Sequence, residues 1–249
     1  MVRPDLVRPD LARPSAVPGP RLVVLDFDGT LADSFGWFCS VLNGVADRYR
    51  FRPVEAHEVE DLRRQGARAI VAHLGIPRWK LPLIARHMHA LAARNAAQIA
   101  LFPGVPAMLA GIADAGVPLA ILSSNRADTV RRVLGPDNAA RIGSYACGAS
   151  IFGKARRLRR LLARTGVPPG RALCIGDEIR DLEAAQALGC PFGAVAWGYT
   201  DPQALADLGP EHLFSDLAEI ARLVAGEADH MPRFAPGTTL VPFPLPNGS

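Results

Sequence analysis

The segment that decides the fold is Val23-Val24-Leu25-Asp26-Phe27-Asp28-Gly29-Thr30-Leu31. Its apolar residues have the character of a buried strand, and that strand ends in two aspartates, Asp26 and Asp28. Side chains two positions apart on an extended segment point to the same side, so both carboxylates can face one pocket. Two unit charges about 4 Å apart repel by roughly 4 kcal/mol at an effective dielectric constant near 20. The pair therefore indicates a bound cation or a shared proton.

Composition limits the class of protein. The chain has 249 residues, of which 49% are hydrophobic, and a formal net charge of +4. This length accommodates one large domain, or a core with a smaller insertion. No segment approaches the roughly 18 unbroken apolar residues of a membrane span, and no signal peptide is visible. The four cysteines have neither zinc-site nor redox-pair spacing, so we expect reduced thiols in a cytoplasmic protein.

Short apolar runs alternate with helical patterns after about residue 100. We expect five strands at 22–25, 117–122, 144–147, 172–175 and 192–196. The helices expected between them are 128–134, 154–164 and 181–188. This alternation predicts an α/β fold in which helices cover both faces of a parallel sheet.

Residues 36–100 interrupt the alternation with helical runs and no clear strand. An insertion of this length predicts a helical cap over the edge of the sheet, and the α/β core would then consist of 21–35 and 101–225. Residues 1–20 repeat the sequence Val-Arg-Pro-Asp-Leu, which predicts a disordered arm because closely spaced prolines prevent a regular helix. Residues 226–249 form a proline-rich tail.

Polar residues follow the predicted strands. They are Asp26 and Asp28 after the first strand, Ser123, Ser124 and Asn125 after the second, and Asp177 and Asp181 after the fourth. Ligands of open parallel sheets bind beyond the carboxyl ends of the strands, so these groups converge on one edge. Lys154 begins a helix, and it is one of only two lysines among 28 basic residues, which favours a functional role.

These groups suit one chemistry. Carboxylate oxygens are hard ligands that suit Mg²⁺, with water and a phosphate completing its coordination shell. One aspartate can attack phosphorus. A second can protonate the leaving oxygen and later take a proton from the hydrolytic water. Lys154 and Ser123 could bind the phosphoryl oxygens.

The chain resembles the haloacid dehalogenase-like phosphohydrolase superfamily over about residues 21–224. The resemblance is carried by Asp26-Phe-Asp-Gly-Thr30, by the hydroxyl residue and the lysine that follow, and by Gly176-Asp-Glu-Ile-Arg-Asp181. Two further segments, Leu101-Phe-Pro-Gly-Val105 and Val195-Ala-Trp-Gly-Tyr199, resemble its phosphoglycolate phosphatase-like branch. The resemblance implies a Rossmann-like three-layer core with an inserted α-helical cap.

The resemblance also implies a role for each matching residue. Asp26 would be the nucleophile and Asp28 the general acid and base. Mg²⁺ would bind Asp26, the Asp28 carbonyl and Asp177, with Asp181 as a further or water-mediated ligand. Ser123 would hold a phosphoryl oxygen, Lys154 would balance charge, and Thr30 would brace the first loop. Ser124 and Asn125 would line the substrate loop, and from the cap we favour Arg68 as a substrate contact.

Together these observations predict a Mg²⁺-dependent phosphoric monoester hydrolase that forms an aspartyl-phosphate. Its substrate would be a small phosphorylated metabolite, with phosphoglycolate favoured by the resemblance. Asp28 argues against a dehalogenase, because the dehalogenases of this superfamily lack that aspartate. A phosphomutase, a phosphonate hydrolase using Lys80 and a non-catalytic binding protein are the alternatives. The arginine-rich helix near Arg156 lacks interleaved aromatic residues for base stacking, so we expect neither a nucleic-acid nor a membrane partner.

Overall fold

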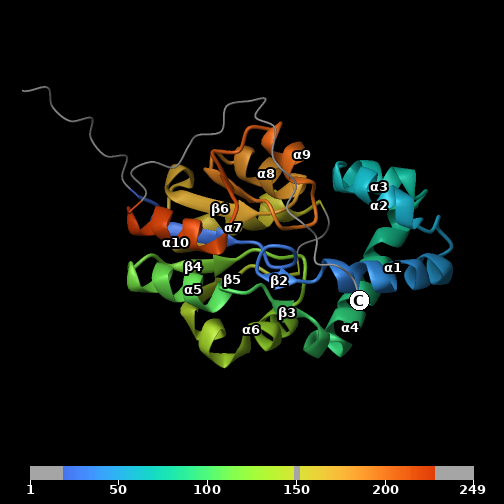
Figure 1. Ribbon diagram of the computed structural model, residues 1–249, viewed down its shortest axis with the longest axis horizontal. Helices are drawn as coiled ribbons and strands as arrows, with labels where there is room; N and C mark the ends of the chain where they lie inside the picture. The colour runs from blue at the N-terminus through green and yellow to red at the C-terminus, as the bar shows by residue number, and fades with distance from the viewer. Residues whose placement is uncertain (1–18, 149–151, 228–249) are drawn as a thin grey trace, which may run out of the picture.

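A parallel sheet forms the centre of the molecule in the computed structural model, which describes residues 19–148 and 152–227 (Figure 1). Its six strands lie in the order β5-β4-β1-β6-β7-β8, and every neighbouring pair is parallel. The strands are β1 (Leu22–Leu25), β4 (Leu119–Ile121), β5 (Ile142–Tyr145), β6 (Ala172–Gly176), β7 (Phe192–Val195) and β8 (His212–Phe214). The predicted α/β fold is confirmed.

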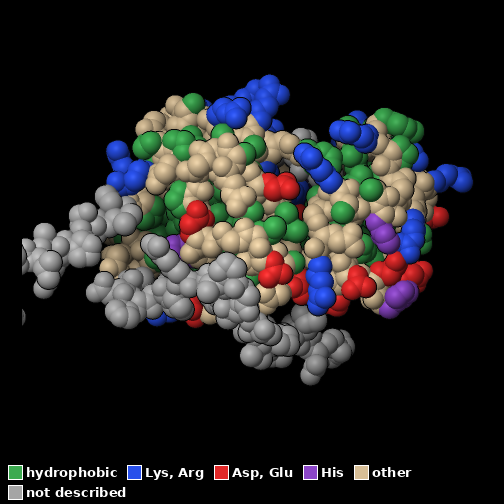
Figure 2. Space-filling model, turned by 90° about the horizontal axis from the view of Figure 1, so that it is seen from above, with side chains coloured by type: hydrophobic (Ala, Val, Ile, Leu, Met, Phe, Trp, Pro, Cys, Tyr) green, Lys and Arg blue, Asp and Glu red, His purple; other side chains and the backbone are tan. Residues whose placement is uncertain are grey.

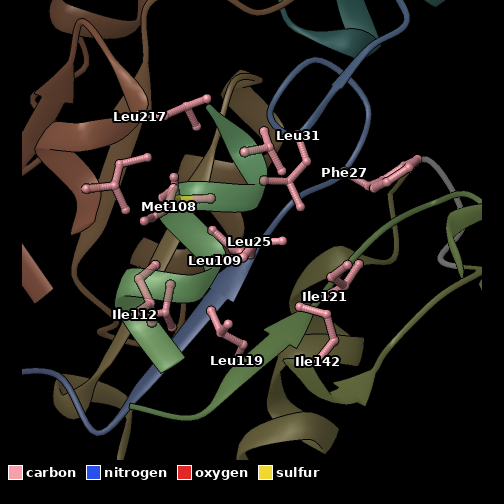
Figure 3. Close-up of a cluster of buried hydrophobic side chains, with 14 of the residues drawn as sticks. Leu25, Phe27, Leu31, Met108, Leu109, Ile112, Leu119, Ile121, Ile142 and Leu217 are labelled. Atoms are coloured by element: carbon pink, nitrogen blue, oxygen red, sulfur yellow. The ribbon is translucent and has the colours of Figure 1, made fainter. Parts of the chain in front are cut away.

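Helices cover both faces because successive residues of each strand point to opposite sides. Val23 and Leu25 of β1 join the apolar cluster of one face, part of which Figure 3 shows, whereas Leu22 and Val24 join the cluster of the other. The first face is covered by α5 (Val105–Asp114), α6 (Ala127–Arg141) and α10 (Leu217–Ala225). The second is covered by α7 (Lys154–Thr165), α8 (Ile179–Gln186) and α9 (Pro202–Ala206). The result is the three-layer core that the alternating pattern predicts.

A helical insertion, residues 35–99, lies beside the sheet (Figure 1). Its helices are α1 (Phe35–Tyr49), α2 (Val59–Arg63), α3 (Ala67–His73) and α4 (Leu81–Arg94), with 3₁₀ turns at Ala56–Glu58, Arg78–Lys80 and Ala96–Gln98. It has a small apolar core of its own, built around Val45, Phe51, Leu74 and Ile84. The chain leaves the core through β2 (Ala32–Asp33) and returns to it through β3 (Ala100–Leu101), and these two strands pair with each other in antiparallel orientation.

The structure differs from the sequence-based expectations at several places. Strand β4, Leu119–Ile121, is shorter than the strand expected at 117–122. It has a sixth strand, β8, which is only three residues long and leaves little pattern in the sequence. The strand expected at 144–147 begins at Ile142. The helix expected at 128–134 continues to Arg141, although it is kinked where Gly135 adopts a φ of 74° and Pro136 follows. A further 3₁₀ turn, Pro169–Arg171, precedes β6.

Three other expectations concern the cysteines, the chain ends and the membrane. All four cysteines are free thiols. The predicted disordered arm and proline-rich tail fall almost wholly outside the described residues. Within the described residues, no helix has the length and apolar character that crossing a membrane requires.

The packing between β7 and β8 predicts one sensitive position. A methyl group at Gly193 of β7 would overlap the ring of Phe214, which is fully buried. We expect Gly193→Ala to lower the free energy of unfolding by about 1–3 kcal/mol, because a well-packed core cannot absorb the extra carbon without strain. Urea denaturation measures the change.

Gly170 provides the matched control. It lies in a 3₁₀ turn, and a methyl group there would meet no atom within 4 Å. Gly170→Ala should therefore change the free energy of unfolding by less than about 1 kcal/mol. Equal losses in the two variants would contradict the packing argument.

Candidate active site

The order of the strands brings the predicted site residues to one edge of the sheet. Strand β1 lies between β4 and β6, and Leu25 is in register with Ile121 of β4 and Ile175 of β6. The residues that follow these three positions therefore leave the sheet side by side. This register explains why groups far apart in the sequence meet.

Three carboxylates form a buried cluster at this edge. Asp26 follows β1, Asp177 follows β6, and Asp181 lies in the first turn of α8. One carboxylate oxygen from each lies within 4.8 Å of the others, and all three residues are buried. Asp28 is half-buried beside them and is not a member of this trio.

Lys154 is the cation that this cluster contains. It is the first residue of α7 and is only 2% exposed. Its Nζ lies 2.8 Å from Oδ2 of Asp26 and also donates a hydrogen bond to Oδ1 of Asp181. One ammonium group is thus shared between two of the carboxylates.

Asp177 is fixed by donors from two other loops. Thr30 Oγ1 donates to its Oδ1 at 2.7 Å, and the backbone N–H of Tyr199 donates to its Oδ2 at 2.8 Å. Two glycines make this close approach possible, because a Cβ at Gly29 or Gly198 would overlap the Asp177 side chain. Gly29 also has a φ of 79°, which residues other than glycine rarely adopt.

Burial shapes the ionisation of the cluster. Loss of solvent raises the pKa of Asp26 and Asp177, and the negative charge of Asp26 raises that of Asp177 further. Burial and the charge of Asp26 together raise the pKa of Asp181 to about 7. Burial alone would lower the pKa of Lys154, but Asp181 and Asp26 outweigh it and keep the ammonium protonated. The cluster therefore holds more acidic groups than one lysine neutralises.

The loop after β4 is hydrogen-bonded to Asp28, in the loop after the neighbouring strand β1. The backbone N–H of Asn125 donates to Ser123 Oγ at 3.0 Å, and its side-chain Nδ2 donates to Asp28 Oδ2 at 3.4 Å. Ser123 is fully buried, whereas Ser124 lines a cavity that Asp28 and Asn125 also line. The structure thus brings together the residues that the sequence predicts for this loop.

Arg68 is placed elsewhere. Its side chain is exposed on α3, and its guanidinium carbon lies 5.5 Å from the ring centre of Phe152. It is not among the residues that line the cavity, so its predicted substrate contact has no geometric support.

Sequence reasoning missed several contributors to the site. Arg180 forms an ion pair with Glu178, and both lie inside the segment that supplies Asp177 and Asp181, so their proximity could have been inferred. Tyr199 acts through its backbone N–H, which no side-chain pattern reveals.

Arg63 of α2 connects the helical insertion to this edge. Its Nε donates to the carbonyl oxygen of Tyr199 at 2.9 Å, and its Nη2 donates to that of Gly198 at 3.0 Å. The backbone N–H of Asp201 donates to the carbonyl oxygen of Arg63 at 2.9 Å. The loop after β7 therefore contacts both the insertion and Asp177.

Comparisons with known proteins point to one family. A family model described as haloacid dehalogenase-like hydrolase matches residues 23–195. Phosphoglycolate phosphatase of Synechococcus elongatus is 30% identical, over 82% of this chain and 97% of its own length. N-acetylmuramic acid 6-phosphate phosphatase of Pseudomonas aeruginosa is 27% identical, over 74% and 84%. The crystal structure of a Lactobacillus plantarum protein has a TM-score of 0.71 at 23% identity, covering 83% of this chain and 100% of that one.

The shared ammonium group makes Lys154→Met a test of the cluster. We expect this variant to lose about 3–5 kcal/mol of unfolding free energy, because Asp26 and Asp181 would be left buried without their cation. Urea denaturation in the absence of divalent ions measures the loss. Lys80→Met is the control, because Lys80 donates to the neutral carbonyl of Tyr49 and should cost only about 1 kcal/mol. Similar losses in both variants would contradict the charge argument.

Proposed function

Since this chain belongs to the haloacid dehalogenase-like hydrolase family, we propose that it hydrolyses phosphate monoesters with Asp26 as nucleophile and Mg²⁺ as cofactor. The family model and the phosphoglycolate phosphatase relatives confirm the prediction of a phosphatase of this family. The metal ion, the chemical steps and the role of each residue are the proposal. The observation that carries it is the buried cluster of Asp26, Asp177 and Asp181 with its single lysine.

The donor set fits Mg²⁺. Asp26, Asp177 and Asp181 offer only hard carboxylate oxygens, and these lie within 4.8 Å of one another. Lys154 is shared between Asp26 and Asp181, so the three carboxyl groups outnumber the one lysine, and a divalent ion would neutralise the remaining negative charge. When bound, Mg²⁺ would draw charge from the phosphoryl oxygens. We propose Asp26 and Asp177 as ligands, together with the Asp28 carbonyl, and Asp181 in direct or water-mediated contact.

The first step transfers the phosphoryl group to the protein. A carboxylate oxygen of Asp26 attacks phosphorus, the bond between phosphorus and the ester oxygen breaks, and the leaving oxygen takes a proton from Asp28. Loss of solvent raises the pKa of Asp28 and so favours the protonated form that this step needs. The products are an aspartyl-phosphate on Asp26 and the free alcohol.

The second step returns the protein to its starting state. Asp28, now a carboxylate, accepts a proton from water while the water oxygen attacks phosphorus. The bond between phosphorus and Asp26 then breaks, which releases inorganic phosphate. Lys154, 2.8 Å from Asp26, would balance the charge of the phosphoryl group, and Ser123 would donate its hydroxyl to a phosphoryl oxygen.

The neighbouring predicted residues would support these steps. Thr30 braces the first loop through its hydrogen bond to Asp177. Ser124 and Asn125 would position the substrate at the loop after β4, where they line the cavity with Asp28. We propose that residues 36–100 act as a cap, which would exclude bulk water when it is closed over the core of 21–35 and 101–225.

The substrate class is a small phosphorylated metabolite. The two curated relatives above are named for different phosphate esters, phosphoglycolate and N-acetylmuramic acid 6-phosphate. Membership in the family therefore supports the hydrolysis of phosphate esters more strongly than it supports any particular alcohol as the leaving group. Phosphoglycolate, expected from the sequence, is the reference compound for a first assay, and a cytoplasmic location stays a prediction.

Neither macromolecular partners nor phosphonate chemistry gain support. Lys80, which a phosphonate hydrolase would need, donates to Tyr49 and does not line the cavity. On the face seen in Figure 2, lysine and arginine side chains lie in separate groups rather than in one continuous band. The absence of nucleic-acid partners remains a prediction, and no observation favours a phosphomutase.

Asp26→Asn tests the nucleophile. We expect phosphate release to fall by at least about 10³-fold, because the amide is a poor nucleophile and the covalent route is lost. The circular dichroism spectrum should be unchanged, because the two side chains have nearly the same shape. A coupled phosphate assay with p-nitrophenyl phosphate measures the loss.

Asp33→Asn is the matched control, on the short strand that follows this loop. Asp33 is exposed on β2 and lies outside the carboxylate cluster, so its variant should retain the activity of the unmodified chain. Full activity in Asp26→Asn would refute the assignment.

Removal of the metal tests the cofactor. We expect EDTA to abolish phosphate release and Mg²⁺ to restore it. Without substrate, Mg²⁺ should also raise the melting temperature of the unmodified chain, because it relieves repulsion among the carboxylates. Asp177→Asn should reduce this shift. Undiminished activity in EDTA would overturn the metal requirement.

A further inference from the structure

We infer that the substrate of this site is the phosphate ester of an apolar alcohol, such as an alkyl phosphate, rather than phosphoglycolate or a sugar phosphate. The inference rests on the proposed phosphatase reaction and adds the chemical class of the leaving group. It is carried by the cavity between the helical insertion and the sheet edge.

The cavity is large and continuous with the candidate active site. Its volume is about 330 Å³, and Asp28, Ser124 and Asn125 line it on the side of the sheet. On the other side it reaches residues of the insertion's own core, including Phe51 and Ile84. Pockets of roughly 300–1,000 Å³ accommodate organic ligands, so the space extends well beyond a phosphoryl group with a two-carbon acid.

Aromatic side chains form the part of the wall nearest the carboxylates. The rings of Phe35 and Phe38 pack against Tyr199, with centroid distances of 5.0 Å and 5.6 Å, and all three residues line the cavity with Asp28. The Tyr199 hydroxyl is already hydrogen-bonded to Ser34 at 2.9 Å. A leaving group beside Asp28 would therefore meet ring faces and edges on this side, and the side chains of Ser124 and Asn125 at the loop after β4.

Aliphatic side chains continue this wall into the insertion. Leu42 of α1, Ile70 of α3 and Met88 of α4 line the cavity. All three also pack against the small core of the insertion. An alkyl chain or ring would bury its surface there, which is favourable at roughly 25 cal/mol per Å² of apolar area.

The basic side chains of the wall already have partners or are largely neutral, although the Nε of Arg180 is buried without a hydrogen-bond partner. Among the described residues that line the cavity, these are Arg63, Arg180 and His89. Arg63 donates to the Gly198 and Tyr199 carbonyls and pairs with Glu60, while Arg180 pairs with Glu178, itself a lining residue. Burial lowers the pKa of His89, which favours its neutral form.

A substrate carboxylate would therefore be poorly accommodated. Phosphoglycolate would place its carboxylate in an apolar cavity that also contains Asp28 and Glu178. Burying a charge without a partner is strongly unfavourable. A sugar phosphate would bury several hydroxyl groups in a wall that consists mostly of rings and alkyl chains, in which the neutral polar side chains include Gln65, Ser124, Asn125 and Thr200. An apolar alcohol meets neither penalty.

Steady-state phosphate release at saturating Mg²⁺ tests the inference. Hexyl phosphate, phosphoglycolate and glucose 6-phosphate are suitable because each carries its phosphate on a primary carbon, which keeps leaving-group reactivity comparable. We expect kcat/KM for hexyl phosphate to exceed the other two by at least about tenfold. Binding gives a second readout: hexylphosphonate, which cannot be hydrolysed, should raise the melting temperature more than phosphonoacetate at equal concentration.

A charge placed in the wall should reverse the preference. Met88→Lys replaces the methionine with a side chain of similar length that ends in an ammonium group, so it places a positive charge in the cavity. We expect it to lower kcat/KM for hexyl phosphate by about tenfold or more and to raise that for phosphoglycolate. Leu83→Lys is the control, because Leu83 lies on the same helix, is 38% exposed and does not line the cavity. It should leave both values unchanged.

The outcomes separate the inference from the reaction on which it rests. If phosphoglycolate or glucose 6-phosphate is hydrolysed as efficiently as hexyl phosphate, the phosphatase stands and the apolar substrate class is wrong. If no ester releases phosphate, the proposed reaction is wrong. In that case, a larger melting-temperature shift with hexylphosphonate than with phosphonoacetate would still show that the cavity prefers an apolar group, and the reverse would show that it does not. The unmodified chain settles the inference even if Met88→Lys does not fold.

Discussion

The ammonium group of Lys154, buried between Asp26 and Asp181, is the interaction on which the rest of the site depends. Removing an ion from water costs several kcal/mol even after the protein relaxes, so these carboxylates are tolerated only because a cation meets them. The compensation is incomplete, because Asp177 belongs to the same cluster and is held by neutral donors. A site built in this way holds more acidic groups than its lysine can neutralise, which raises their pKa values, and a bound divalent cation would relieve the imbalance. The same imbalance that costs stability would thus create affinity for the proposed cofactor.

The sequence predicted that these carboxylates meet at one edge of the sheet, because parallel strands impose a simple geometry. Asp26 and Asp177 each follow a strand, and neighbouring strands release their chains at one edge, so burial and proximity followed from pattern alone. The expectation for Arg68 had no such support, because a position on a cap helix does not determine where a long side chain ends. The backbone of Tyr199 was unpredictable for another reason, since its contribution is an N–H that every residue except proline has. Strand β8 was missed because three residues give too little periodicity to recognise.

The insertion and the carboxylate cluster are linked through one short loop. Arg63 donates to the carbonyl oxygen of Tyr199, and the N–H of the same residue donates to Asp177. Gly198, which accepts the second hydrogen bond from Arg63, has no side chain, because a Cβ there would overlap Asp177. The position of α2 therefore affects the loop that orients Asp177, one of the proposed metal ligands. A displacement of the insertion could not leave these hydrogen bonds unchanged.

The two parts of the chain impose different requirements on a substrate. In the proposed reaction the sheet edge would recognise what all phosphate monoesters share, because its carboxylates, lysine and serine would face the phosphoryl group. The insertion supplies most of the cavity wall, and there shape and polarity are set by residues such as Phe38 and Met88, whose replacement would leave the carboxylate cluster intact. Relatives can therefore keep the reaction while their alcohols differ, as the names of the Synechococcus and Pseudomonas phosphatases illustrate. Overall identity near 30% is informative about the phosphoryl chemistry, whereas the leaving group must be argued from the wall of this particular cavity.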